Sequence, residues 1–276
     1  MSVRVIEGDC RDVLASMEPA SIDLVVADPP YGETSLKWDR WQDGWMGLLR
    51  PLLKPHGSVW VFGSLRMFME HADEFSGWQL AQDVIWEKHN GSNAFNDRFR
   101  RVHEAAAHFY PSDASWTAVY KSPLYSNDAT ARTVRRKHKP QHWGVIGESF
   151  YESHDGGPRL LRSVWPCRSE HGRALHPTQK PVGIIAPMLA YSCPAGGTVL
   201  DPFCGSGTTG VAAQAAGLSF IGIEARHDYA EMARKRVAGD APLLSPRAVY
   251  NPTADFSNSY NLACSEMHQR VKGAAE

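Results

Sequence analysis

The chain has 276 residues, of which 43% are hydrophobic, and its formal net charge is −1. A chain of this length can bury a full core and accommodates one large α/β domain with an insertion, while a net charge near zero neither favours nor excludes a nucleic-acid partner. No apolar run approaches the roughly 20 residues that span a bilayer, and the first residues show no signal peptide or lipidation motif, so we expect no membrane association.

The cysteines favour a reducing compartment. There are five of them, widely spaced, and they form no Cys-x-x-Cys or Cys/His ligand pattern. Such usage is typical of a protein without disulfides or structural zinc. We therefore expect a cytoplasmic protein and no bound metal.

The first 110 residues alternate predicted strands and helices. Apolar stretches with the composition of buried strands lie at 3–6, 22–27, 58–62 and 78–86. Helices are expected from about 41 to 53 and from Gly63-Ser64 onward. This alternation predicts a mostly parallel sheet with helices packed on it.

The stretch Asp28-Pro29-Pro30-Tyr31 directly follows the predicted strand at 22–27. Two adjacent prolines supply no backbone donors and have φ fixed near about −65°, so the carbonyl of Pro29 is held outward beside the Asp28 carboxylate. Two acceptors and a flat ring suit the exocyclic amino group of a planar base, with Tyr31 stacked on the base. A strand that ends in Asp-Pro-Pro is often only a turn, so this interpretation needs support from the rest of the chain.

A second site is predicted after the strand at 198–201. Its turn reads Asp201-Pro202-Phe203-Cys204-Gly205-Ser206-Gly207-Thr208-Thr209-Gly210, and an Ala-rich helix at 211–216 and a strand at 218–223 follow, ending at Glu224. This is a βαβ unit with glycines at its first turn and an acid after its second strand. The glycines let the backbone approach a ligand, and Glu224 is placed to accept hydrogen bonds from ribose hydroxyls.

The glycines also fit G-x-G-x-x-G, so a nicotinamide cofactor is an alternative. Two features count against it. In the dinucleotide fingerprint the glycines directly follow the strand, whereas here Asp-Pro-Phe-Cys intervenes, and Asp201 would place a carboxylate near a pyrophosphate. A carboxylate suits a cationic ligand such as the α-ammonium group of a methionine moiety, so S-adenosylmethionine (SAM) fits better than NAD.

Regular periodicity fades between residues 111 and 175, a long segment for a connection in a compact domain, and we interpret it as a target-recognition region. A run of basic residues without an acid lies within it, namely Arg132, Arg135, Arg136, Lys137 and Lys139. A smaller group, Arg98, Arg100 and Arg101, precedes it. Either group could neutralise phosphates, although a solvated charged loop is the alternative. A helix at 181–191 restores the α/β pattern.

Three motifs together resemble the β class of SAM-dependent DNA amino-methyltransferases, over residues 3–237. They are Asp28-Pro29-Pro30-Tyr31, the turn from Asp201 to Thr209, and His176-Pro177-Thr178-Gln179-Lys180-Pro181, and their order is that of the β class. The resemblance implies an α/β, permuted Rossmann-like methyltransferase fold with a mostly parallel doubly wound sheet. Its parts would be a catalytic half (1–110), the inserted target-recognition region (111–175), a cofactor-binding half (176–237) and an extended or partly disordered tail (238–276).

The resemblance also assigns roles to residues. Asp28, Pro29, Pro30 and Tyr31 would be catalytic. The SAM pocket would be lined by Asp9, Cys10, Asp28, His176, Thr178, Lys180, Asp201, Phe203, Cys204, Gly205, Ser206, Gly207, Thr208 and Glu224. Within it, Thr178 and Lys180 would hold the methionine carboxylate and Asp9 the adenine amino group, although Gly-Asp after a strand also suits plain turn chemistry. Lys88, Asn90, Arg98 and Arg101 would contact DNA together with the basic run, and His103-Glu104 fits a structural role as well as a contact role.

The predicted activity is transfer of a methyl group from SAM to adenine N6 of a base flipped out of double-stranded DNA, because the target atom is inaccessible inside a duplex. Asp rather than Ser at the start of the motif favours adenine, and cytosine N4 is the alternative. A non-catalytic, SAM-responsive DNA-binding protein is the alternative from another class. Chemistry at cytosine C5 would need a thiolate at Pro166-Cys167, which we interpret as structural. The resemblance also implies a homodimer, located in the bacterial cytosol or nucleoid or encoded by a phage.

Overall fold

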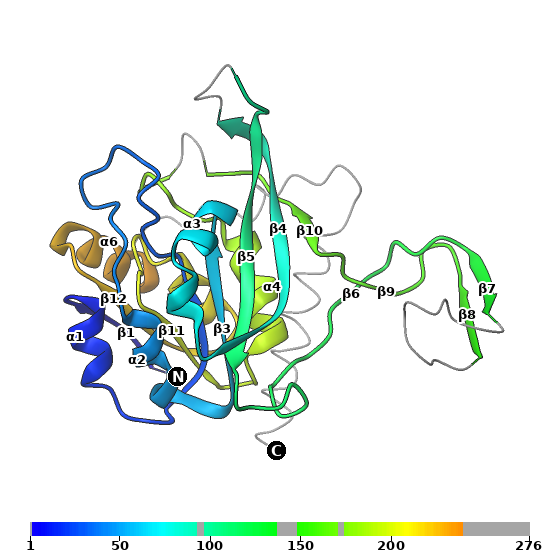
Figure 1. Ribbon diagram of the computed structural model, residues 1–276, viewed down its shortest axis with the longest axis horizontal. Helices are drawn as coiled ribbons and strands as arrows, with labels where there is room; N and C mark the ends of the chain where they lie inside the picture. Colours follow the sequence, from blue (N-terminus) through cyan, green and yellow to red (C-terminus); the bar gives the residue numbers. More distant parts are fainter. Residues whose placement is uncertain (1, 93–96, 137–147, 171–173, 240–276) are drawn as a thin grey trace.

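The structure is a computed structural model that describes residues 2–92, 97–136, 148–170 and 174–239 (Figure 1). Its centre is an eight-stranded sheet. From edge to edge the strands are β1 (Val3–Glu7), β12 (Ser219–Glu224), β11 (Thr198–Asp201), β2 (Ile22–Ala27), β3 (Leu53–Gly63), β5 (Arg101–Pro111), β4 (Trp78–Ser92) and β10 (Val164–Pro166). Neighbours are parallel, except that β5 is antiparallel to both β3 and β4. The predicted, mostly parallel α/β fold is confirmed.

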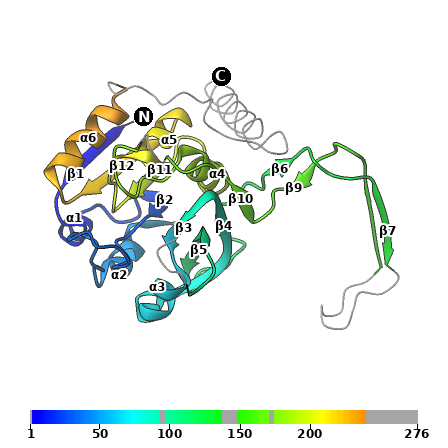
Figure 2. The same cartoon turned by 90° about the horizontal axis from the view of Figure 1, so that it is seen from above.

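Helices cover both faces of this sheet (Figure 2). One face carries α1 (Cys10–Ala15), α2 (Trp45–Leu49) and α3 (Leu65–Glu70), with the 3-10 turns η1 (Arg50–Leu52) and η2 (Ala72–Phe75), and the other carries α4 (Val182–Ser192), α5 (Thr208–Ala215) and α6 (His227–Val237). Successive residues of a strand point to opposite faces, so Leu24 and Val26 of β2 join the core under α4 while Val25 and Ala27 join the core under α2. All six residues of β2 are buried, as expected for a strand covered on both faces. In the described part of the chain no helix is long and apolar enough to cross a membrane.

The strand order shows a permutation. If β11 is counted as the first strand, the order β1, β12, β11, β2, β3 and β4 becomes 3-2-1-4-5-6, which is the doubly wound order. β5 is inserted between β3 and β4. The order reverses between β11 and β2, and ligands of such sheets bind at the carboxyl ends of the strands at this switch point. The predicted catalytic motif follows β2 and the predicted cofactor turn follows β11, so two distant parts of the sequence meet there.

Several elements depart from the predicted boundaries. The helix expected at 41–53 is shorter, because Gly44 has a left-handed φ of 86° and Pro51, which has no N–H, falls in η1. β3 begins at Leu53, five residues before the strand predicted at 58–62. The predicted strands at 22–27 and 198–201 match β2 and β11.

Residues 111–175 contain more regular structure than the sequence predicts. β6 (Tyr125–Ser126) pairs with β9 (Arg159–Leu160), and β7 (Arg132–Arg136) pairs with β8 (Ser149–Ser153). These two antiparallel pairs form an arm that extends away from the central sheet (Figure 1). The chain then returns to the sheet as β10, beside β4. The tail predicted at 238–276 lies outside the described residues beyond Gly239.

Candidate active site

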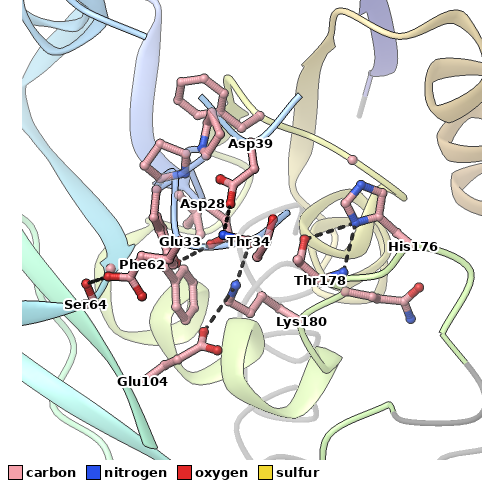
Figure 3. Close-up of a pocket in the computed structure, with 18 of the residues that line it drawn as sticks. Asp28, Glu33, Thr34, Asp39, Phe62, Ser64, Glu104, His176, Thr178 and Lys180 are labelled. Carbon is pink, nitrogen blue, oxygen red and sulfur yellow. Dashed lines mark hydrogen bonds and ion pairs between the residues drawn. The ribbon is translucent and has the colours of Figure 1, made fainter. Parts of the chain in front are cut away.

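One large cleft, with a volume of about 2570 Å³, opens along the edge where the parallel strands end. Asp28 follows β2, Asp201 ends β11 and Glu224 ends β12, and all three line the cleft. Figure 3 shows how side chains from different parts of the sequence converge in this cleft. The topology thus gathers three carboxylates at the switch point of the sheet.

Most of the predicted site residues line this cleft. They are Asp9, Cys10, Asp28, Pro29, Pro30, Tyr31, His176, Thr178, Lys180, Asp201, Phe203, Cys204, Gly205, Ser206, Thr208 and Glu224. Gly207 instead lies behind the turn, at the N-cap of α5 with φ 80°. A Cβ there would lie 3.2 Å from the Cα of Ala233 in α6, so Gly207 permits close packing of the turn on that helix.

The predicted DNA-binding residues fall into two groups. Lys88, Arg98 and Arg101 line the cleft. Arg132 and Arg135 lie on β7 in the arm, far along the chain from the catalytic motif. The side chains of Asn90 and Arg136, and the whole of Lys137 and Lys139, lie outside the described part of the structure.

Both carboxylate oxygens of Asp28 are engaged. The hydroxyl of Tyr31 donates to Oδ1 over 2.6 Å, and Nζ of Lys180 lies 2.5 Å from Oδ2. Burial raises the pKa of Asp28, and the Lys180 ammonium opposes that effect. Each carboxylate oxygen has a second lone pair, so Asp28 can still accept a hydrogen bond from a ligand amino group.

Asp201 and Glu224 place buried negative charge beside the glycine turn. The N–H of Phe203 donates to Asp201 Oδ1 over 3.0 Å, and the N–H of Gly205 donates to Glu224 Oε2 over 2.9 Å. Burial raises the pKa of Asp201 to about 7, and the carboxylates of Asp28 and Glu224 add to the rise. The hydrogen bonds that Asp201 accepts lower its pKa but do not outweigh burial. Burial also raises the pKa of Glu224. A ligand with positive charge would relieve the repulsion between these buried carboxylates.

Comparison with known proteins identifies the family. A family model described as DNA methylase matches residues 22–235. The chain belongs to this DNA methylase family. It is 29% identical to the Type II methyltransferase M.HinfI of Haemophilus influenzae, over 84% of this chain and 67% of that protein, and 29% identical to the Type II methyltransferase M2.DpnII of Streptococcus pneumoniae, over 86% and 90%.

Solved structures show the same fold. The complex of M1.HpyAVI with SAM has a TM-score of 0.57 and 24% identity, covering 85% of this chain and 99% of that one. The cytosine-N4-specific PvuII DNA methyltransferase has a TM-score of 0.59 and 15% identity, covering 96% and 93%. These structures show the fold, and the family match over residues 22–235 makes the protein a DNA methyltransferase of the amino-methylating family, as the sequence motifs predict.

In this methyltransferase, Asp28 belongs to a chain of alternating charges (Figure 3). Nζ of Lys180 lies 3.3 Å from Oε2 of Glu104 as well as beside Asp28, and Lys88 pairs with Oε1 of Glu104. Burial raises the pKa of Glu104, but the two lysines outweigh it and lower that pKa to about 2. The sequence predicts Lys180 at a cofactor carboxylate, whereas the structure places its ammonium between two carboxylates of the protein itself.

The loop after Tyr31 is tied down by Asp39, a residue that the sequence analysis missed. Its carboxylate accepts hydrogen bonds from the N–H of Gly32 over 2.8 Å and of Thr34 over 2.7 Å. Gly32 has φ 73°, in the left-handed region that favours glycine. These contacts fix the backbone that leaves the catalytic motif, so Asp39 supports the wall of the cleft.

Trp38 connects this loop to the later part of the methyltransferase chain, at His176 and Tyr229. Its ring centroid lies 5.2 Å from that of His176 and 6.4 Å from that of Tyr229 in α6. Nδ1 of His176 accepts a hydrogen bond from the N–H of Thr178 over 3.3 Å. Burial lowers the pKa of His176 to about 4, so its ring is neutral at physiological pH.

Asp9 has a structural role at the start of α1, whereas the sequence suggested turn chemistry as the alternative to a cofactor contact. Its side chain caps α1 by accepting from the N–H of Arg11 over 2.9 Å, and its carboxylate pairs with the Arg11 guanidinium at 2.8 Å. The hydrogen bonds from Arg11 lower the pKa of Asp9. Asp9 also lines the cleft, so a contact with an adenine ring stays a prediction.

Arg236 supports the glycine turn from behind, and no sequence signal points to it. Its Nη1 donates to the carbonyl of Ser206 over 3.1 Å, to the hydroxyl of Ser206 over 2.9 Å and to the hydroxyl of Thr208 over 3.0 Å. The hydroxyl of Ser206 in turn donates to Oε1 of Gln179 over 3.1 Å. A basic residue in the last turn of a helix is ordinary, so this contact with the glycine turn was not foreseeable.

Cys167 is buried in the core beyond β10. Burial raises the pKa of its thiol to about 12, and its Sγ lies 3.8 Å from the carbonyl oxygen of Arg168. A protonated, buried thiol is a poor nucleophile, which agrees with the structural role expected for it. Among the residues that the structure describes, no group of three His, Cys, Asp or Glu side chains is arranged to hold a metal ion.

Proposed function

We propose that this DNA methyltransferase transfers the methyl group of SAM to N6 of an adenine flipped out of double-stranded DNA. The observation that carries the proposal is the position of Asp28. Its carboxylate has spare acceptor capacity and lies beside the aromatic ring of Tyr31, in the same cleft as the glycine turn that begins at Asp201. A base amino group and a cofactor can therefore share one cleft.

The charge of the cleft supports SAM as the methyl donor. Asp201 would hold the α-ammonium group, because a cation lowers the free energy of its buried, ionised form. Glu224 would hold the ribose hydroxyls, since each of its oxygens accepts one backbone hydrogen bond and keeps a lone pair. Gly205 has φ 51°, and a Cβ there would meet the His176 ring only at 3.9 Å, so its bare backbone leaves room for a ligand. When bound, SAM supplies a methyl group on a sulfonium leaving group.

The task left to the protein is to make the base amino group nucleophilic. The lone pair of the amino nitrogen is delocalised into the base ring, and this lone pair must localise on the nitrogen as the nitrogen becomes tetrahedral. Hydrogen bonds from the amino group to Asp28 and to the Pro29 carbonyl would favour that change most strongly in the transition state. Lys180 keeps negative charge on Asp28 by pairing with it. The methylated nitrogen, which is positively charged, then loses one proton to Asp28 or to water.

The choice of base rests on the first residue of the motif. Asp rather than Ser at position 28 favours adenine. Cytosine N4 is the second candidate, because its amino group offers the same two hydrogens to the same acceptors.

We also propose a division of labour along the chain. Residues 1–110 and 176–237 would form the catalytic and cofactor-binding halves, and residues 111–175 the recognition region. Arg132 and Arg135 of the arm would neutralise phosphates. A homodimer would let two arms act on one duplex, and sedimentation equilibrium with and without DNA tests it: a monomer in both conditions refutes it.

The first experiment incubates the protein with SAM and unmethylated genomic DNA, digests the DNA to nucleosides and identifies methylated species by mass spectrometry. N6-methyladenine is the expected product, and N4-methylcytosine would overturn the choice of base. Asp28→Ala is expected to lower kcat by about 10²–10³ while SAM binding is retained, because one stabilising partner of the transition state is removed. Intact SAM binding without any methylated base would favour the non-catalytic alternative.

A further inference from the structure

Phe99 is fully exposed, and it lines the cleft that contains Asp28. Single exposed apolar residues are ordinary on protein surfaces, so exposure alone indicates nothing. Its position is what matters. Phe99 is the kind of side chain that a protein normally buries, and here it stands at the opening through which a base would enter.

The topology brings Phe99 to this opening. β3 and β4 are both antiparallel to β5, so they run in the same direction and both end at the edge where Asp28 lies. The chain returns from that edge as β5, and residues 97–100 directly precede it. Figure 1 shows β4 and β5 rising above the body of the sheet at this end. The segment that carries Phe99 therefore overhangs the cleft.

Contacts tie this segment to the catalytic loop. Arg101, two residues after Phe99, pairs with Glu33 at 2.7 Å. Glu33 also accepts a hydrogen bond from Ser64, the N-cap of α3 (Figure 3). The next residue, Leu65, is 75% exposed and lines the same cleft. We call Phe99 and Leu65, both exposed and both lining the cleft, its apolar rim; each lies within two residues of a side chain that contacts Glu33 in the loop after Tyr31.

Arginines surround this apolar rim. Arg98, Arg100 and Arg101 flank Phe99, Arg66 follows Leu65, and all four line the cleft. Arg98 pairs with Asp97 and Arg101 with Glu33, so part of this charge is compensated within the protein. An apolar ring set among guanidinium groups complements a DNA duplex, whose base faces are apolar and whose phosphates are negative.

We propose that Phe99 enters the base stack of the duplex and fills the space left by the flipped target base. This inference rests on the proposed function, since only a flipped base leaves such a space. Extrusion of a base breaks its pairing and stacking, and proteins that unstack DNA insert apolar side chains between base steps. Phe99 would replace the lost stacking with its own ring. It would act without touching the reacting atoms, as a positioning residue for the flipped state.

The test compares Phe99→Ala with Met69→Ala. Met69 in α3 is also an exposed apolar residue, at 71%, and it lies outside the lining of the cleft. Two duplexes carry the site mapped from methylated genomic DNA. In one the target base is paired, and in the other it lies opposite an abasic position, where less energy is needed to extrude it.

Phe99→Ala is expected to lower kcat/KM on the paired duplex by about 10- to 100-fold, the scale of one lost base–aromatic stack. On the abasic duplex the same variant should stay within about threefold of the unmodified enzyme, because pairing no longer opposes flipping. Phe99→Trp should restore activity on the paired duplex. Met69→Ala should match the unmodified enzyme on both, and all variants should keep its affinity for SAM.

Three results would overturn the proposal. In the first, Phe99→Ala retains full activity on the paired duplex. In the second, it loses equal activity on both duplexes, which indicates a general DNA contact. In the third, it changes the sedimentation coefficient, which indicates a contact between copies of the chain. If the unmodified enzyme methylates neither duplex, the proposed function itself fails. That outcome is distinct, because it appears before any variant is compared.

Discussion

Asp201→Asn is expected to make the cofactor-free methyltransferase more stable. Asp201 is 4% exposed, and its pKa is raised from 3.8 to about 7, chiefly by burial. In the unfolded chain the carboxyl group loses its proton near pH 3.8, so the folded protein binds more protons between these two values. Stability therefore falls as pH rises through this window. At about 1.4 kcal/mol per pH unit, the ionised carboxylate costs the folded state ~4 kcal/mol above pH 7.

The assay is urea unfolding of cofactor-free protein at pH 5 and pH 8. Asn keeps an oxygen that can accept from the N–H of Phe203 and carries no charge. The gain in stability over the unmodified enzyme should be larger at pH 8 than at pH 5 by ~2–3 kcal/mol. Asp23→Asn is the matched control, because Asp23 is also buried but pairs with Lys54 and His56, and its pKa is lowered. Its stabilisation is complete by about pH 5, above the unfolded pKa of 3.8, so the control should lose a similar amount of stability at both pH values.

The same Asp201→Asn protein should bind SAM at least ~10-fold more weakly by isothermal titration calorimetry, because a charge-assisted hydrogen bond is lost. A stability difference from the unmodified enzyme that does not change between pH 5 and pH 8 would refute the reasoning. It would mean that ionisation of Asp201 does not destabilise the folded protein, so the charge of the cleft would not favour a cationic ligand.

Two further predictions follow from buried charges. Glu104→Gln should lower kcat by about 10-fold with little effect on SAM affinity, because Lys180 would then pair only with Asp28 and weaken it as an acceptor. Burial lowers the pKa of Lys180, but the carboxylates of Asp28 and Glu104 outweigh it and raise that pKa. Without the Glu104 charge, the alkaline limb of the pH–kcat profile should move to lower pH, and an unmoved limb would contradict the role. His108 is fully buried against Trp60, and burial lowers its pKa from 6.5 to about 3. Stability should therefore fall as pH drops below 6.5, by ~2 kcal/mol at pH 5, and His108→Phe should show a smaller fall in urea unfolding; an equal fall would exclude His108 as its source.

The parts of the fold that the sequence predicts well are those with strong local signals. The all-buried strand β2 is a continuous apolar run, and β11 is bounded by glycines and an acid, so both boundaries were predicted correctly. The helix expected at 41–53 depends on weaker evidence. The apolar spacing there is helical, but the left-handed Gly44 and the position of Pro51 shorten it. Pairing of strands β6 to β9 in the arm involves short, polar segments, whose partners no periodicity reveals.

The residues of the candidate site also differ in how well the sequence predicts them. Asp28 follows β2 and Asp201 ends β11, each at a turn whose composition is itself informative, so both could be found from the sequence. The contact of Lys180 with Asp28 joins residues 152 positions apart, and the same lysine could equally have faced a cofactor carboxylate. Asp39 and Arg236 act on backbone groups and hydroxyls of other segments, and neither lies in a pattern that marks it. Only the folded chain shows which of several polar residues reaches the cleft.

The antiparallel direction of β5 has a consequence for how this enzyme can diversify. A parallel strand in that place would need a crossover of a dozen or more residues that leaves the catalytic edge and re-enters the sheet at the opposite one. Because β5 is antiparallel, the connection from β4 both leaves and returns at the catalytic edge. Residues can be inserted, deleted or exchanged in this turn without shifting the register of the parallel strands or the glycine turn. This part of the cleft rim can therefore vary between relatives while the parallel strands and the glycine turn beneath it stay the same.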